Sequence, residues 1–211
     1  MTIAYDDVLQ WIRNFAAEIS DNKQQLSKLD AAIGDGDHGA NMDRGMQAAL
    51  AKLEAVSGDD VGAALKVVGM ALISKVGGAA GPLYGTLFLQ LASATGGKSE
   101  LSAEDWSSAL ESAVKGVQAR GKAEPGDKTM IDALAPARDV FRDAIEGGAS
   151  LGDALERSAA AAKEGMDATV PLVARKGRAS YLGERSAGHQ DPGATSSHMM
   201  LKIAAETWKN A

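Results

Sequence analysis

The chain has 211 residues, 45% hydrophobic and 24% charged, which fits one large globular domain over residues 1–211. Its net charge of −6 argues against a nucleic-acid partner, because a phosphate backbone needs a basic face, and the lack of cysteine excludes disulfides and thiolate chemistry. The sequence shows neither a signal-peptide pattern nor an apolar run near the roughly 18 residues of a membrane helix, so we expect a cytoplasmic protein without a membrane partner.

Apolar residues recur at steps of three and four through the first half of the chain, which is the pattern of helices that bury one face. The first stripe comprises Val8, Ile12, Phe15 and Ile19. Further stripes predict one helix that follows Asn41 and runs to about residue 53, one from residue 61 to the glycines at 77–78, and one after residue 82.

The second half of the chain continues with helices that have recognisable caps. Ser102 and Asp105 resemble a capping pair for a helix whose buried stripe begins at Trp106. Asp127 is expected to cap the next helix, and Pro136 is expected to bend or break it locally.

The C-terminal part is expected to contain two more helices. Residues 151–166 are alanine-rich, and the last helix should run from Asp191-Pro192 to about Trp208, with proline in the favoured first turn. No stretch shows the sustained alternation of a strand. About eight helices must therefore bury their stripes against each other in an all-α domain.

Residues 30–41 read Asp-Ala-Ala-Ile-Gly-Asp-Gly-Asp-His-Gly-Ala-Asn. The glycines permit a tight backbone, and the carboxylates of Asp30, Asp35 and Asp37 repel each other unless cations lie among them. A lone Asp-Gly-Asp would be an ordinary turn that caps the next helix. The third aspartate favours a magnesium site instead.

Three further loops have residues suited to a phosphorylated ligand. Residues 77–85 lack bulky side chains at the start of a helix, so their N–H groups can approach phosphate, although close helix packing explains them equally well. Residues 120–130 combine cations with Met130, an adaptable contact for a base, although a helix end and a solvated turn are the simpler interpretation. Residues 175–193 concentrate four cations in an acidic chain, and a connection this long is usually functional or disordered.

Taken together, residues 34–41, 77–83, 121–130, 175–185 and 188–196 resemble motifs of the nucleotide-binding L subunit of bacterial dihydroxyacetone kinase. The motifs appear in the family's order, and the resemblance covers essentially the whole chain. One departure is Ala80, where many members carry serine, so a hydroxyl contact to phosphate is missing while the backbone N–H remains.

The resemblance implies an eight-helix antiparallel barrel or bundle that binds ADP or ATP, with two Mg²⁺ ions, in loops at one rim. It implies that Asp30, Asp35 and Asp37 hold the metals and that Arg178, approaching the phosphates, is the catalytic residue. The nucleotide contacts that it implies are His38, Gly39, Ala40, Asn41, Ala79, Ala80, Gly121, Met130, Arg178, Asp191, Pro192 and Gly193.

The resemblance also implies a reaction and a set of partners. The nucleotide would act as a cofactor that receives a phosphoryl group from the phosphohistidine carrier subunit M of the sugar phosphotransferase system. A separate K subunit would hold dihydroxyacetone covalently and accept the group, so this chain, a homodimer, would be inactive alone. Phosphoryl transfer needs mainly positioning and charge neutralisation, which metals and Arg178 can supply.

Three alternatives remain open from the sequence. The chain could belong to an ATP-exchanging kinase for dihydroxyacetone or a related ketose such as erythrulose. It could be a non-catalytic nucleotide sensor that acts on a transcription regulator. It could also be a helical divalent-cation binder, although the aspartate loop does not continue into an EF-hand. Related domains in fatty acid kinases are normally fused to further domains.

Overall fold

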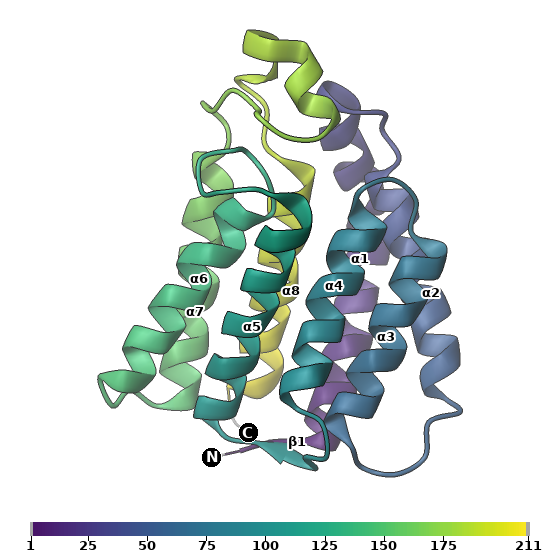
Figure 1. Cartoon of the computed structure of the whole chain (residues 1–211), viewed down its shortest axis with the longest axis vertical. Coiled ribbons are helices and arrows are strands. Elements are labelled where there is room, and N and C mark those ends of the chain that lie inside the picture. Colours follow the sequence, from purple (N-terminus) through teal and green to yellow (C-terminus); the bar gives the residue numbers. More distant parts are fainter. Residues whose placement is uncertain (1, 210–211) are drawn as a thin grey trace.

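The computed structural model describes residues 2–209, which form eight α-helices, one 3₁₀ segment and one pair of two-residue strands (Figure 1). The all-α prediction is confirmed. In chain order the elements are β1 (Ile3–Ala4), α1 (Tyr5–Ile33), α2 (His38–Leu53), α3 (Val61–Lys75), α4 (Ala80–Ala94), β2 (Glu100–Leu101), α5 (Ala103–Gly121), α6 (Ile131–Glu146), α7 (Leu151–Ala168), η1 (Arg178–Ser186) and α8 (Pro192–Trp208).

The eight helices close into a ring. Each helix packs against the next one in the chain, and α8 returns to pack against α1. The helices alternate in direction, so α2, α4, α6 and α8 all begin at one end of the ring (Figure 1). We call this end the rim, and we call the opposite end, where α1 begins beside the β1–β2 pair, the floor. The predicted eight-helix antiparallel barrel is confirmed.

The floor is filled by a cluster of aromatic side chains. The ring of Trp11 lies 5.0 Å from that of Trp208, 5.6 Å from that of Trp106 and 5.9 Å from that of Phe88, measured between centroids. The indole N–H groups of Trp11 and Trp208 donate to the carbonyls of Met200 and Asp7 at 3.1 and 3.0 Å. The polar edges of these two indoles are therefore satisfied while the rings remain buried.

Several predicted helix details are confirmed. The stripe of Val8, Ile12, Phe15 and Ile19 is buried, and Ser102 forms the expected capping box at the start of α5. No helix within residues 2–209 is long and apolar enough to cross a membrane.

One prediction for α6 was wrong and a second was wrong in part. Asp127 does not cap this helix, which begins at Ile131; its carboxylate accepts from the N–H of Glu124 at 2.9 Å, inside the preceding turn. Pro136 does not break the helix, which continues to Glu146, while a bend at Pro136 stays a prediction. α7 packs closely on the turn before Pro136, since a Cβ at Gly165 would be 2.0 Å from the Asp132 carbonyl oxygen.

Helix ends at the rim also differ from the predicted ones. α2 and α4 begin a few residues early, at His38 and Ala80, and α1 extends to Ile33. Residues predicted to lie in loops therefore occupy the first or last turns of helices. The 175–193 connection contains the 3₁₀ segment η1, which the sequence did not predict.

Candidate functional site

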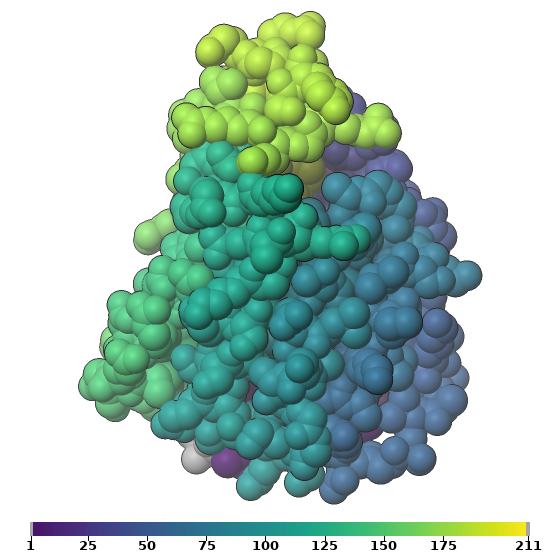
Figure 2. All heavy atoms as spheres, viewed as in Figure 1, coloured from purple at the N-terminus to yellow at the C-terminus, as the bar shows by residue number. Residues whose placement is uncertain are grey.

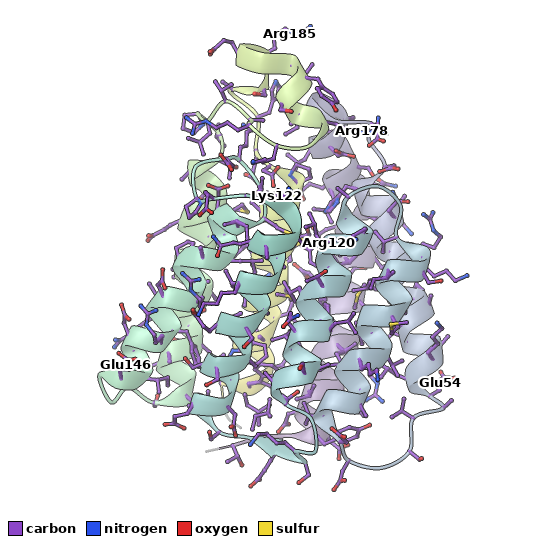
Figure 3. All side chains as sticks on the ribbon, viewed as in Figure 1. Glu54, Arg120, Lys122, Glu146, Arg178 and Arg185 are labelled. Carbon is purple, nitrogen blue, oxygen red and sulfur yellow. The ribbon has the colours of Figure 1, made fainter. Side chains whose placement is uncertain are left out.

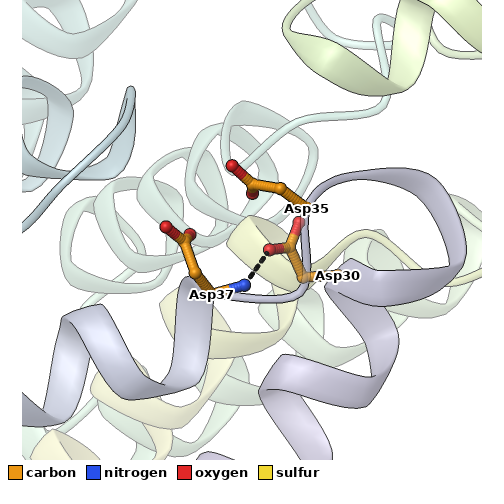
Figure 4. Close-up of side chains that lie close together, drawn as sticks. All are labelled: Asp30, Asp35 and Asp37. Carbon is orange, nitrogen blue, oxygen red and sulfur yellow. Dashed lines mark hydrogen bonds between the residues drawn. The ribbon is translucent and has the colours of Figure 1, made fainter.

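Three carboxylates meet at the rim, where α1 ends and α2 begins (Figure 4). Asp30, Asp35 and Asp37 each offer an oxygen atom, and these atoms lie within 4.8 Å of one another. Asp30 belongs to the last turn of α1, where the helix dipole favours a cation. Carboxylate oxygens in this arrangement are the donors that Mg²⁺ prefers.

Local backbone geometry fixes the first of these carboxylates. Asp30 Oδ2 accepts hydrogen bonds from the N–H groups of Asp37 and His38 at 2.9 and 3.1 Å. A Cβ at Gly34 would lie 2.2 Å from Asp30 Oδ1, so only glycine leaves room for the carboxylate here. Burial raises the pKa of Asp30, the two backbone hydrogen bonds lower it, and the charges of Asp35 and Asp37 raise it further. A divalent cation would relieve this repulsion, so the donor set fits a metal.

Arg178 lies beside this cluster. Its Nη2 is 3.1 Å from Asp35 Oδ2, and it starts the η1 segment that sits on top of the rim (Figures 2 and 3). The structure thus brings the predicted catalytic residue next to a predicted metal ligand. The pair is largely exposed, so it contributes little to stability.

A cavity of ≈ 630 Å³ extends from the carboxylates into the rim. This volume is typical of small-ligand sites. One wall is apolar and suits an aromatic base; it contains Leu83, Val117, Ala123, Met130 and Ile131. The lining also contains charged side chains, namely the three aspartates with Lys176 and Arg178.

The starts of four helices line this cavity, and one of them is suited to phosphate. At α2 the N–H groups of Asp37 and His38 already donate to Asp30, and at α8 the Asp191 carboxylate caps the N–H of Ala194 at 2.7 Å. At α6 the N–H groups of Thr129 and Ile131 donate to Asp132 Oδ2 and Thr129 Oγ1. The N-cap of α4 is Ala79, which provides no side-chain cap. Its free N–H groups and dipole therefore form the natural place for an anion.

Most of the predicted site residues line the same cavity. Those that do are Asp30, Asp35, Asp37, His38, Ala79, Ala80, Gly121, Met130, Arg178, Asp191, Pro192 and Gly193. Gly39, Ala40 and Asn41 are absent from the cavity lining, and nucleotide contacts for these three residues stay a prediction.

Gly39 and Asn41 have structural surroundings that explain their residue types. A Cβ at Gly39 would lie 2.0 Å from the Lys23 carbonyl oxygen, so glycine permits α1 and α2 to approach closely. Asn41 accepts a hydrogen bond from Arg44, which also donates to the Lys75 carbonyl at 3.0 Å. This chain of contacts links α2 to the end of α3, just before the loop that leads into α4.

The cations predicted in the two basic loops have different locations. Arg120, Lys176 and Arg178 line the cavity, whereas Lys122 is not part of its lining (Figure 3). Arg185 projects from the outer tip of η1 (Figure 3). Lys128 is buried and donates to backbone carbonyls, so the suggestion that it neutralises phosphate is not supported.

A buried hydrogen-bond network below the cavity was missed by the sequence reasoning. His38 Nε2 lies 2.9 Å from Ser196 Oγ, and the Tyr84 hydroxyl lies 2.6 Å from Ser196 Oγ and 3.0 Å from Ser197 Oγ. Burial lowers the pKa of His38 to about 4 and raises that of Tyr84 to about 12, so both are neutral at pH 7. The available signal was the run of hydroxyl residues at 195–197, inside a helix otherwise rich in apolar residues.

The ring of helices and its rim site correspond to a known class of protein. A model of the DAK2 domain matches residues 32–206, and the chain belongs to this family. It is 43% identical over 205 residues, 97% of this chain and 98% of the relative, to the PEP-dependent dihydroxyacetone kinase ADP-binding subunit DhaL of Escherichia coli. It is 40% identical over 204 residues, with the same coverage, to the PTS-dependent ADP-binding subunit DhaL of Lactococcus lactis.

Solved structures show the same fold. The dihydroxyacetone kinase of C. freundii in complex with AMP-PNP and Mg²⁺ aligns with a TM-score of 0.69 at 25% identity, covering 94% of this chain and 33% of that one. The L-erythrulose 1-kinase of Mycolicibacterium smegmatis is 36% identical, and the match covers 95% of this chain but 35% of that relative. The domain thus occurs both as a separate subunit and as part of longer kinases.

Proposed function

We propose that this chain is the nucleotide-binding subunit of a dihydroxyacetone kinase and that it holds Mg²⁺–ADP as a cofactor. A phosphohistidine carrier subunit donates the phosphoryl group, which passes to dihydroxyacetone on a separate K subunit. The observation that carries the proposal is one cavity that contains the aspartate cluster, Arg178, an uncapped helix start and an apolar wall. The near full-length similarity to ADP-binding subunits supports it.

Each part of the cavity has a defined task in this proposal. Asp30, Asp35 and Asp37 would hold Mg²⁺, which supplies charge neutralisation for phosphate oxygens. The N–H groups at the start of α4 bind phosphate, and the wall around Met130 holds the base and excludes water. Arg178 places its guanidinium beside the carboxylates, where charge develops during transfer.

The proposal assigns His38 and Tyr84 a structural task and leaves phosphoryl acceptance to a partner. Both side chains are buried and hydrogen-bonded to Ser196, so they hold the lining of the cavity in place. No ketose-binding feature accompanies them in residues 2–209, which is why the proposal assigns the sugar to a partner.

The test is mass spectrometry of bound nucleotide after long dialysis, in wild type, Asp35→Ala and the control Asp143→Ala. Asp143 is a surface residue of α6 that pairs with Arg142, so its loss removes one carboxylate away from the cavity. We expect wild type and the control to retain ADP and Asp35→Ala to lose it. The affinity for ADP with Mg²⁺ should fall by about 100-fold or more, since even outer contacts of a metal site are worth 10- to 100-fold.

Other results would select an alternative. Wild type that is empty and binds ATP reversibly with Mg²⁺ would favour the ATP-exchanging ketose kinase, for which the erythrulose kinase relative gives a precedent. Tight ADP binding without transfer in any mixture with partner subunits would favour the sensor. No nucleotide binding at all would contradict the proposal.

A further inference from the structure

The connection between α7 and α8, residues 169–191, is the segment that holds Arg178 over the rim. Its two ends meet at the side chain of Lys128. The ammonium group donates to the carbonyls of Thr169 and Leu172, at 2.8 and 3.1 Å, at the start of the connection. It also donates to the carbonyl of His189 at the end. A longer contact of 3.4 Å reaches the Val170 carbonyl. An ammonium group has three N–H donors, so these four carbonyls engage all of them.

Burial and backbone conformation mark Lys128 as an unusual residue. It is 1% exposed, and its φ of 63° lies in the left-handed region that favours glycine. Burial lowers the pKa of its amine, an effect that the nearby carboxylates of Asp191 and Asp132 oppose. A lysine in such a place persists only when its surroundings compensate for the lost hydration, and the ring of carbonyl oxygens does so.

Further hydrogen bonds around Lys128 join the two ends of the connection to each other. Gly188 N–H donates to the Val170 carbonyl at 2.8 Å, and Asp191 N–H donates to Thr169 Oγ1 at 3.0 Å. Arg175 N–H donates to the Asp127 carbonyl at 3.1 Å, which ties the connection to the Lys128 loop itself. We call this set of contacts the neck of the 169–191 connection.

The segment beyond the neck is anchored differently. η1 is largely exposed, with Tyr181 at 87%, and glycines with positive φ flank and interrupt it at 177 and 183. Arg178 contacts the aspartate cluster from this exposed segment. η1 also contacts α1, and its last residue, Ser186, is buried and accepts from the N–H of Ala174 at 2.8 Å. The neck, where the two ends of the connection meet, is the further buried attachment on which the location of Arg178 depends.

We propose that Lys128 is a positioning residue that closes the neck and thereby holds Arg178 beside the metal-binding carboxylates. Lys128 acts through the connection and does not itself bind phosphate, because its N–H groups are committed to carbonyls. The inference rests on the proposed function for the task of Arg178, but the closure of the neck can be tested without nucleotide.

The first experiment is hydrogen exchange, read by mass spectrometry, on nucleotide-free wild type, Lys128→Met and Lys115→Met. Methionine keeps the length of the side chain and removes its donors. Lys115 pairs with Glu111 at 2.9 Å on the surface, so its substitution is a matched loss of charge. In Lys128→Met we expect the neck amides of residues 175, 188 and 191 to exchange on the order of tenfold faster or more, because buried charge-assisted bonds are lost. Lys115→Met should match wild type.

If Lys128→Met does not fold, the hydrogen-exchange rates of wild type alone still test the proposal. The neck amides should be protected far longer than those of residues 178–186. Similar exchange rates in the two segments would overturn the proposal, and so would unchanged neck exchange in a folded Lys128→Met protein.

The last experiment separates positioning from a general structural role. Phosphoryl transfer is measured in the reconstituted system for Lys128→Met, Arg178→Ala and the double variant. If Lys128 acts through Arg178, the double variant loses no more activity than Arg178→Ala alone. Independent, multiplying losses would overturn the proposal. Wild type that binds no nucleotide would contradict the proposed function, while the exchange result still decides whether the neck is closed.

Discussion

The floor and the rim of the ring bury different kinds of side chain. The floor contains three tryptophans and Phe88 packed together, and the indole N–H groups of Trp11 and Trp208 donate to backbone carbonyls. The rim buries His38, Lys128 and Asp191. Burying apolar rings stabilises the fold, whereas burying ionisable groups costs free energy unless each finds partners.

The contrast shows how one ring can separate stability from ligand binding. Trp11 and Asp30 lie on the same helix, α1, and 19 residues of helix place them about 28 Å apart. The floor can therefore supply stability that offsets strained and repelling groups at the rim, without contacting the ligand. This division of tasks makes opposite predictions for substitutions at the two ends.

The largest effect is expected at the floor, from Trp106→Ala. The indole of Trp106 is 1% exposed and contacts Trp11 and Trp208, so its removal leaves a cavity. The free energy of unfolding should fall by about 3–5 kcal/mol, as measured by urea denaturation. ADP affinity at a temperature where the variant is folded should equal that of wild type. A weaker affinity would show that floor and rim are coupled.

The next effect is expected at the rim, from Gly34→Ala. The added methyl group would meet Asp30 Oδ1 at 2.2 Å and displace that carboxylate. The affinity for ADP with Mg²⁺, measured by titration calorimetry, should fall by about 10- to 100-fold. Gly96→Ala is the matched control, since the nearest contact of its Cβ would be an ordinary 3.7 Å. Equal affinities in the two variants would contradict the site.

The smallest effect is the pH dependence of the unfolding free energy, to which two rim residues contribute with opposite signs. Burial raises the pKa of Asp191 to about 7, so the native state keeps a proton that the unfolded state loses above about pH 4. Stability from this group therefore falls as pH rises between those values. Burial lowers the pKa of His38 to about 4, so its contribution rises with pH between about 4 and 6.5. The two slopes, each about 1.4 kcal/mol per pH unit, oppose each other.

In Asp191→Asn the pH dependence of stability that comes from His38 should no longer be cancelled by that of Asp191. In nucleotide-free protein with EDTA, wild type should show little net change from these two groups between pH 4.5 and 6. The variant should gain about 1.4 kcal/mol of unfolding free energy per pH unit over that range. Urea denaturation followed by tryptophan emission measures this. Trp106 and Trp208 lie at the floor ends of α5 and α8 and contact Trp11, whereas the substitution is at the rim end of α8. A flat profile in the variant would contradict the opposing slopes.

Features encoded locally in the sequence were predicted well. The helical stripes depend on residues three and four apart, and the aspartate cluster falls within eight residues, so spacing was enough to indicate both. The class of fold followed from the stripes. That the helices close into a ring, and which helix packs beside which, was predicted from the family resemblance and not from periodicity.

Features that join distant segments were not predictable in the same way. The acceptors of Lys128 lie 41 to 61 residues away, and Ser196 lies 158 residues from His38. Asp127 was assigned as a helix cap because aspartate is a preferred residue at the start of a helix. In the structure Asp127 satisfies Glu124 and Asp132 satisfies Thr129, which only the folded turn reveals.

An even number of antiparallel helices has a consequence for how such a domain can be joined to others. A ring of eight alternating helices runs up four times and down four times, so it returns to the face where it started and Ile3 and Trp208 both lie at the floor (Figure 1). Polypeptide added at either end would emerge away from the ligand-binding face. A gene fusion can therefore join this domain to a second catalytic unit and leave the cavity at the rim accessible. The longer kinases, in which the matched region is about a third of the chain, are in keeping with this arrangement.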